Sequence, residues 1–163
     1  MTNWTTPITW DVGRHVSAND LNAQLRDNLL VLGEGSGAMV EALTTYYTSS
    51  TVITNMGNLA LTLPVRHGGR VLVAFAGSLT MGTSVMTGSG NIWLYIDGTH
   101  YPLGQVNNSG LAISGWVTLL YLTQNLSISS HDIRMRWSVT STDNTVRLSA
   151  GANTPARLIA VEL

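Results

Sequence analysis

The feature that most constrains this fold is the absence of helical periodicity from about residue 44 onward, where short apolar segments alternate with turn sequences. Residues 132–139 show the pattern most clearly, because every second side chain is apolar (Ile133, Met135, Trp137, Val139). A period of two predicts a strand with one buried and one wet face. The expected strands lie near residues 44–48, 51–54, 59–63, 70–80, 91–97, 100–105, 111–122, 131–140, 145–149 and 156–163.

Several of these strands are apolar on both faces. Residues 116–122 contain one polar side chain, Thr118, and residues 70–76 and 92–96 are also apolar at both parities. Such strands are typical of parallel sheets covered by helices. Because helical segments are missing between them, the pattern predicts an antiparallel sandwich whose outer face is covered by another subunit. The expected interface side chains are Leu72, Trp93, Tyr95, Val117, Leu119 and Tyr121.

Turn sequences and charges support an antiparallel body. Asp97-Gly98 directly follows a strand and is a strong hairpin signal. About ten short strands in the body are typical of a jelly-roll sandwich. Three arginines are expected on one solvated outer face, paired with nearby aspartates or forming a patch for an anionic ligand (Arg134, Arg136, Arg147; Asp132, Asp143).

The first 33 residues predict a short helix behind an extended arm. Ser17 suits the N-cap, Asp20 completes a capping box, and Gly33 suits the C-terminal end. Leucines recur at helical spacing between them (Leu21, Leu25, Leu29, Leu32). The expected division is an anchoring arm over 1–16, an amphipathic helix over 17–33, a glycine-rich linker over 34–45 and a jelly-roll sandwich over 46–163.

The arm and the helix are candidates for attachment to a larger particle. An arm this short folds poorly by itself, yet it carries two tryptophans and an isoleucine. The expected anchoring residues are Trp4, Ile8, Trp10, Leu21, Leu25 and Leu29. They contact either symmetry mates or a particle surface, or else the arm and helix pack back on their own sandwich.

Composition and motif searches argue against an enzyme. The chain has no cysteine and no lysine, so disulfides, thiolate metal sites and a Walker A loop are excluded. The net charge of −1 provides no general attraction for nucleic acid or for an anionic membrane. The four histidines are far apart in sequence, and no paired-carboxylate or Gly-x-Ser-x-Gly motif is present. We expect no catalytic residues, no cofactor and no metal, with calcium at Asp97 or Asp143 as a weaker alternative.

Two stretches resemble known families. The strand order, carried by residues 69–73, 93–98, 131–137 and 156–163, resembles the trimeric jelly rolls of the tumour-necrosis-factor and C1q type, which many bacteriophage appendages use. Residues 10–32, with Asp-Leu-Asn followed by Leu-Arg-Asp-Asn, resemble a leader found on phage structural proteins. The resemblance implies a homotrimer and a virion protein of the head decoration, head fibre or tail-appendage kind.

These observations lead to two functional expectations. The first is a bacteriophage virion surface structural protein, a trimeric decoration or short-appendage subunit attached through its N-terminal arm and helix to capsid or tail proteins. It would be made in the host cytoplasm. The alternative is a receptor- or glycan-binding head domain of a tail fibre, which would contact a host surface glycan or receptor through loops 81–90 and 105–112.

Overall fold

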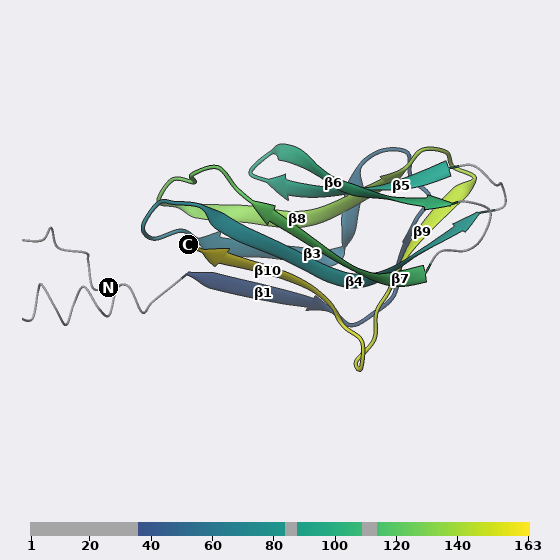
Figure 1. Ribbon diagram of the computed structural model, residues 1–163, viewed down its shortest axis with the longest axis horizontal. Helices are drawn as coiled ribbons and strands as arrows, with labels where there is room; N and C mark the ends of the chain where they lie inside the picture. Colours follow the sequence, from purple (N-terminus) through teal and green to yellow (C-terminus); the bar gives the residue numbers. More distant parts are fainter. Residues whose placement is uncertain (1–35, 84–87, 109–113) are drawn as a thin grey trace, which may run out of the picture. The chain divides into compact units, whose positions relative to one another are not determined.

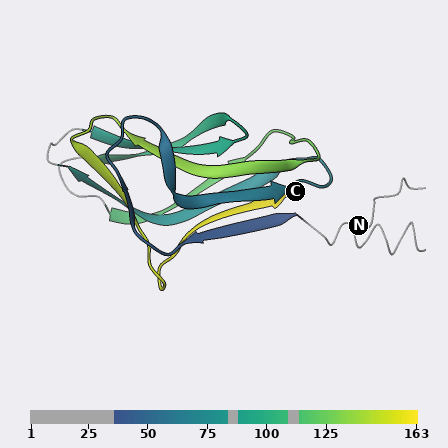
Figure 2. The same ribbon diagram turned by 180° about the vertical axis from the view of Figure 1, so that it is seen from behind.

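The computed structural model describes residues 36–83, 88–108 and 114–163, which form ten strands in two antiparallel sheets packed face to face (Figures 1 and 2). The strands are β1 (Gly37–Ala42), β2 (Tyr46–Thr48), β3 (Thr54–Pro64), β4 (Val71–Thr83), β5 (Gly88–Ile96), β6 (Thr99–Asn108), β7 (Ser114–Leu122), β8 (Ser130–Val139), β9 (Asn144–Ser149) and β10 (Ala156–Glu162). The predicted antiparallel all-β body is confirmed, and its two-sheet arrangement is consistent with a jelly roll. The helix expected over residues 17–33 lies outside the described residues.

One sheet is built around the long strand β4. The first half of β4 pairs with β10 and its second half pairs with β9, while β7 pairs along its other edge. β1 extends the sheet beyond β10, and β2 extends it beyond β9. Among the residues that the structure describes, β7 pairs in this sheet with β4 alone, so it is an edge strand. The other sheet has the order β3-β8-β5-β6.

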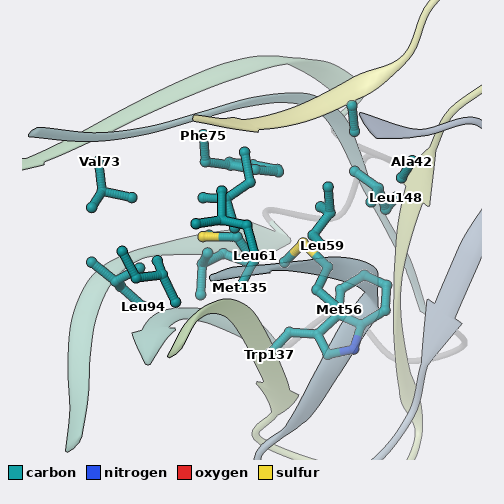
Figure 3. Packing of buried hydrophobic residues seen from close by; sticks show 14 of the residues in the cluster. Ala42, Met56, Leu59, Leu61, Val73, Phe75, Leu94, Met135, Trp137 and Leu148 are labelled. Atoms are coloured by element: carbon teal, nitrogen blue, oxygen red, sulfur yellow. The ribbon is translucent and has the colours of Figure 1, made fainter. Parts of the chain in front are cut away.

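The core lies between the two sheets and is filled by alternate side chains of their strands (Figure 3). Phe75 on β4 and Leu148 on β9 meet the layer formed by Leu94, Met135 and Trp137 of the other sheet, and all five side chains are buried. The alternation predicted for 132–139 is confirmed, because Ile133, Met135, Trp137 and Val139 all lie in this core. Burial of such side chains is the main force that holds the sheets together.

The Asp97-Gly98 sequence forms the predicted hairpin turn between β5 and β6. Both residues have positive φ, 46° at Asp97 and 96° at Gly98. Two successive positive φ values are what a two-residue type I′ turn requires, and aspartate and glycine tolerate them best. The turn aligns Ile96 with Thr99 at the start of the hairpin.

The two strands expected near 51–54 and 59–63 are one strand, β3, interrupted by an irregularity. Its pairing with β8 shifts register between Asn55 and Ala60. Gly57 within this break has a φ of 59°, and a Cβ atom there would lie 2.5 Å from the ring of Tyr46. Glycine therefore allows the chain to bend against an aromatic ring without ending the strand.

β1 lies within the range 34–45 that the sequence predicts to be a glycine-rich linker. Its residues pair with β10 from Gly37 opposite Val161 to Ala42 opposite Ala156. Ala42 is fully buried, and Ala38 and Val40 pack against the core. The alternation in this strand is weak, and its partner lies more than a hundred residues away, so local sequence shows little of it.

Candidate functional site

One part of the outer face of the six-stranded sheet, formed by β1, β10, β7 and the first half of β4, is rich in apolar side chains, whereas the part formed by β9 carries Thr145, Arg147 and Ser149. In β4, Val71, Val73 and Phe75 turn into the core, so Leu72 and Ala74 between them point outward. The same alternation in the neighbouring strands gives a set that we call the apolar face: Met39, Leu72, Ala74, Trp116, Leu120, Leu122, Ile159 and Val161. These residues come from β1, β4, β7 and β10, which are adjacent strands of one sheet.

The strand register aligns these side chains in rows. Leu122 of β7 lies opposite Leu72 of β4, which lies opposite Val161 of β10. The next row runs Leu120, Ala74, Ile159 and Met39 across all four strands. Directly opposed side chains on one face of an antiparallel pair lie in contact range. The apolar face is therefore continuous over these two rows, whereas Trp116 lies opposite Ser78, beyond a row that contains Thr118 and Arg157.

Exposure is high at the outer strands of the apolar face and lower at its centre. The exposed fraction is 65% for Leu120, 59% for Trp116 and 59% for Met39, whereas Leu72, Ala74 and Ile159 are partly buried. In the row next to that of Leu120 and Met39, Arg157 and Glu41 form an ion pair with an Nε–Oε1 distance of 2.7 Å, so their charges largely compensate each other. Contiguous exposed apolar surface of this kind marks an interaction site in soluble proteins.

The predicted interface residues fall in three different places. Leu72 lies on the apolar face, whereas Val117, Leu119 and Tyr121 turn inward from β7 and pack against the core. Trp93 and Tyr95 lie on the outer face of the other sheet. The structure thus brings only Leu72 to the apolar face. The assignment of the six residues to an interface stays a prediction.

Sequence reasoning missed the three exposed residues of β7, Trp116, Leu120 and Leu122, although the signal was present. Residues 116–122 are apolar at both odd-numbered and even-numbered positions, so hydrophobicity alone does not indicate which face of the strand turns toward the core. In the structure the core takes the odd-numbered side chains, and Tyr121 lies with its ring centroid 5.1 Å from that of Tyr101 on β6. The six predicted anchoring residues, Trp4, Ile8, Trp10, Leu21, Leu25 and Leu29, lie outside the described residues.

The outer face of the four-stranded sheet carries polar and aromatic groups instead. We call Trp93, Tyr95, His100, Arg134 and Arg136 the arginine–aromatic cluster. The guanidinium carbon of Arg136 lies 4.8 Å from the centroid of the Tyr95 ring, and that of Arg134 lies 5.7 Å from it. Arg134 forms an ion pair with Asp132 at 2.8 Å, as the sequence predicts. The cluster thus combines two cations with aromatic rings on a sheet surface.

The prediction that Arg147 shares this face is wrong. Arg147 lies on β9, which belongs to the six-stranded sheet, whereas Arg134 and Arg136 lie on β8 of the other sheet. Consecutive strands are expected to pair as a hairpin, but here the chain crosses between sheets after β8. Arg147 lies instead over the ring of Tyr47 on β2, 5.9 Å from its centroid.

A buried histidine joins the turn between β5 and β6 to the start of β8. His131 Nδ1 lies 2.5 Å from Asp97 Oδ2, and its Nε2 lies 2.9 Å from the Ser127 carbonyl oxygen. Both partners are acceptors, so both ring nitrogens carry protons when both bonds form. Burial alone would lower the pKa of His131, but the bonds to Ser127 and Asp97 outweigh it and raise that pKa above 6.5.

Ser129 completes an arrangement that superficially resembles a catalytic triad. Its Oγ lies 3.1 Å from Nε2 of His131, on the side opposite Asp97. A triad histidine must offer an unprotonated Nε2 to accept the serine proton. The Ser127 carbonyl requires a proton on that same nitrogen, so the group serves as a structural clamp.

The described residues show neither a metal centre nor a membrane segment. Within them, no group of three or more histidine, aspartate or glutamate side chains is arranged to hold a metal ion. Nor does this part of the chain contain a helix long and apolar enough to cross a membrane.

No protein-family model matches the chain, and neither does any curated protein. Solved structures resemble it more distantly. Eiger TNF from S. frugiperda has a TM-score of 0.44 and 13% identity, covering 79% of this chain and 92% of that one. A structure of infectious bursal disease virus, Gx strain, has a TM-score of 0.43 and 12% identity, and the match covers 79% of this chain and 37% of that one. Murine APRIL has a TM-score of 0.40 and 13% identity, and the match covers 80% of this chain and 100% of that one. Similarities at this level carry no information on function.

Proposed function

We propose that this protein is a structural subunit of a bacteriophage virion surface, a homotrimer that self-associates through the apolar face. The apolar face is the observation on which the proposal rests. In antiparallel sheets with one wet face, polar side chains alternate with apolar ones. The four-stranded sheet follows this rule with Asp132, Arg134 and Arg136 on its outer side, whereas the part of the six-stranded sheet that carries the apolar face departs from it.

A second copy of the same chain is the occupant that fits the apolar face best. Burying a leucine, methionine or valine side chain contributes about 1.5–3 kcal/mol. The row of Leu120, Ala74, Ile159 and Met39 supplies several apolar side chains at once, and their burial favours association against its entropic cost. The edge strand β7 lies at one border of this face, where a symmetry mate could cover it. Threefold symmetry comes from the resemblance in strand order.

The attachment to the virion rests on the first 33 residues. Trp4, Ile8 and Trp10 in the expected arm, with the leucines of the expected helix, would contact capsid or tail proteins. Deleting residues 1–16 and measuring the copy number of the protein in purified particles tests this part. Loss of incorporation is expected, and unchanged occupancy would contradict it.

The self-association is tested by Leu120→Glu. Because Leu120 is already 65% exposed in the protomer, a glutamate there should leave the sandwich folded. In the interface the same charge would be buried without a partner, which costs several kcal/mol. We expect the variant to be a folded 17.5 kDa monomer by sedimentation equilibrium.

Val52→Glu is the matched control, because Val52 is 71% exposed and lies in the loop before β3, away from the apolar face. It should keep the oligomeric mass of the unmodified chain. A trimeric Leu120→Glu variant would contradict the proposed interface. Dissociation of both variants would show that the effect of the charge is unspecific.

A further inference from the structure

Arg136 is a fixed cation without a carboxylate partner in the described part of the chain. Its Nε donates a hydrogen bond to Asn55 Oδ1 at 2.9 Å, and its Nη1 lies 2.7 Å from His100 Nε2. The nearby carboxylate of Asp132 is taken up by Arg134, which binds it through Nε and Nη2. Two arginines and one aspartate leave this surface with one uncompensated positive charge.

The guanidinium of Arg136 is held in position by an amide, an imidazole and an aromatic ring. An N–H of Arg136 donates to His100 Nε2, because a guanidinium has no acceptor. The Tyr95 ring lies beneath the guanidinium, 4.8 Å from its carbon atom. A guanidinium has five N–H donors, and these contacts use two of them. Three N–H donors on Nη1 and Nη2 therefore remain for an anion, and a carboxylate can accept from two of them.

The surroundings of Arg136 offer more than charge. Trp93 lies directly opposite Arg136 on β5 and is half-buried, with its indole N–H donated to Ser138 Oγ at 3.4 Å. On the next row, Gln105 Nε2 donates to Asn91 Oδ1 at 2.9 Å. The side-chain oxygen of Gln105 and the side-chain N–H groups of Asn91 have no hydrogen-bond partner among the described residues. The surface therefore presents an aromatic side chain, a cation and amide groups side by side.

We propose that this surface, centred on Arg136 and Trp93, binds a carboxylated saccharide such as a uronic or sialic acid residue. The carboxylate would pair with Arg136, the C–H face of the sugar ring would lie on Trp93, and the hydroxyl groups would bond to Asn91 and Gln105. A peptide carboxylate would pair with Arg136 but would leave the side-chain amides of Asn91 and Gln105 without a hydrogen-bond partner on the ligand. This surface belongs to the four-stranded sheet, so binding does not depend on the apolar face of the other sheet.

Saturation-transfer and heteronuclear NMR titrations of the full chain at neutral pH test the proposal. The probes are two acidic glycosides, methyl glucuronide and methyl N-acetylneuraminide. Three control compounds accompany them: methyl glucoside lacks the carboxylate, acetate lacks the sugar, and N-acetylglutamate amide carries a carboxylate on a peptide-like group. We expect an acidic glycoside to bind with a Kd of about 1 mM and to shift the Trp93 indole N–H. Methyl glucoside, acetate and the glutamate derivative should bind at least about tenfold more weakly.

Arg136→Gln should weaken binding of the acidic glycoside at least about tenfold. Arg136→Lys should weaken it less, because lysine keeps the positive charge but lacks the planar set of guanidinium N–H donors. Arg70→Gln is the control: it removes the same charge from an exposed position before β4 and should leave binding unchanged. Unfolding midpoints of all variants are measured first. If Arg136→Gln fails to fold, the lysine variant and the wild-type titrations decide.

The outcomes separate this proposal from the proposed function. Absence of binding by both acidic glycosides to the wild-type chain would overturn it, as would equal affinity for acetate or for the glutamate derivative. Equal affinity of the wild type and Arg136→Lys for the acidic glycoside, with no shift at Trp93, would overturn it as well. None of these results depends on the oligomeric mass, which tests the apolar face.

Discussion

Replacing His131 by glutamine should remove a part of the stability that depends on pH. His131 ties the hairpin turn at Asp97 to the Ser127 carbonyl with one bond from each ring nitrogen. Glutamine has a similar size and can donate to one of these acceptors. It cannot carry the positive charge or reach both acceptors with the same geometry. The variant should fold with the same two sheets but with a weaker clamp between the turn and β8.

The expected loss follows from the contacts. A hydrogen bond to a charged group contributes about 1.5–3 kcal/mol to stability. The His131 side chain is only 5% exposed, but that of Asp97 is 45% exposed, and solvent screens the pair. We therefore expect a loss of about 1–2 kcal/mol in the free energy of unfolding when the pair is fully charged.

The pH dependence has a definite sign. The pKa of His131 is raised, so its contribution is complete below its unfolded value of 6.5 and is lost as pH rises through the folded pKa. Burial alone would raise the pKa of Asp97, but its bonds to His131 and to the Asp132 amide lower it below 3.8. Its contribution is complete above that value and is lost as pH falls through the lowered pKa. The pair is strongest between these limits.

Urea unfolding of the wild type and of His131→Gln, at one fixed protomer concentration, measures the effect. The difference in free energy should be largest near about pH 5.5 and should shrink by about pH 9. Asp97→Asn, which keeps the turn residue type and removes the charge, should flatten the same dependence. A difference that stays constant or grows between the two pH values would refute the charged clamp.

Two further perturbations test the fold. Glu162→Gln should cost about 1–2 kcal/mol at neutral pH, because the carboxylate accepts the backbone N–H groups of Arg66 and His67 at 3.0 and 2.8 Å. Burial alone would raise the pKa of Glu162, but these bonds lower it below 4.5, so variant and wild type should converge in acid unfolding as pH falls through that pKa. Gly57→Ala should destabilise by more than about 1 kcal/mol, because the φ of 59° disfavours a side chain and its Cβ would lie 2.5 Å from the Tyr46 ring. A neutral effect on the thermal midpoint would contradict that packing.

Local sequence was enough to predict those parts of the fold that depend only on neighbouring residues. Period-two alternation over residues 132–139 identified β8 and its core side chains, because one face is apolar and the other charged. Asp97-Gly98 identified its hairpin, because few residue pairs accept two positive φ values. Both features are decided by residues within one strand or one turn.

The parts that sequence did not provide depend on distant partners. The sequence could not predict which face of β7 turns toward the core, because its two faces are almost equally apolar. Only packing against β4 and the core places Leu119 inside and Leu120 outside. β8 and β9 follow each other in the chain but lie in different sheets, which separated Arg147 from Arg136. His131 and Asp97 are 34 residues apart and meet only after β5 and β8 pair.

The mass of the unmodified full chain at micromolar concentration tests the central claim most directly. Burial of the apolar face by symmetry mates predicts a species of about 52 kDa in sedimentation equilibrium, three copies of the 17.5 kDa chain. A single, stable species of 17.5 kDa that leaves Leu120 and Trp116 in water would contradict it.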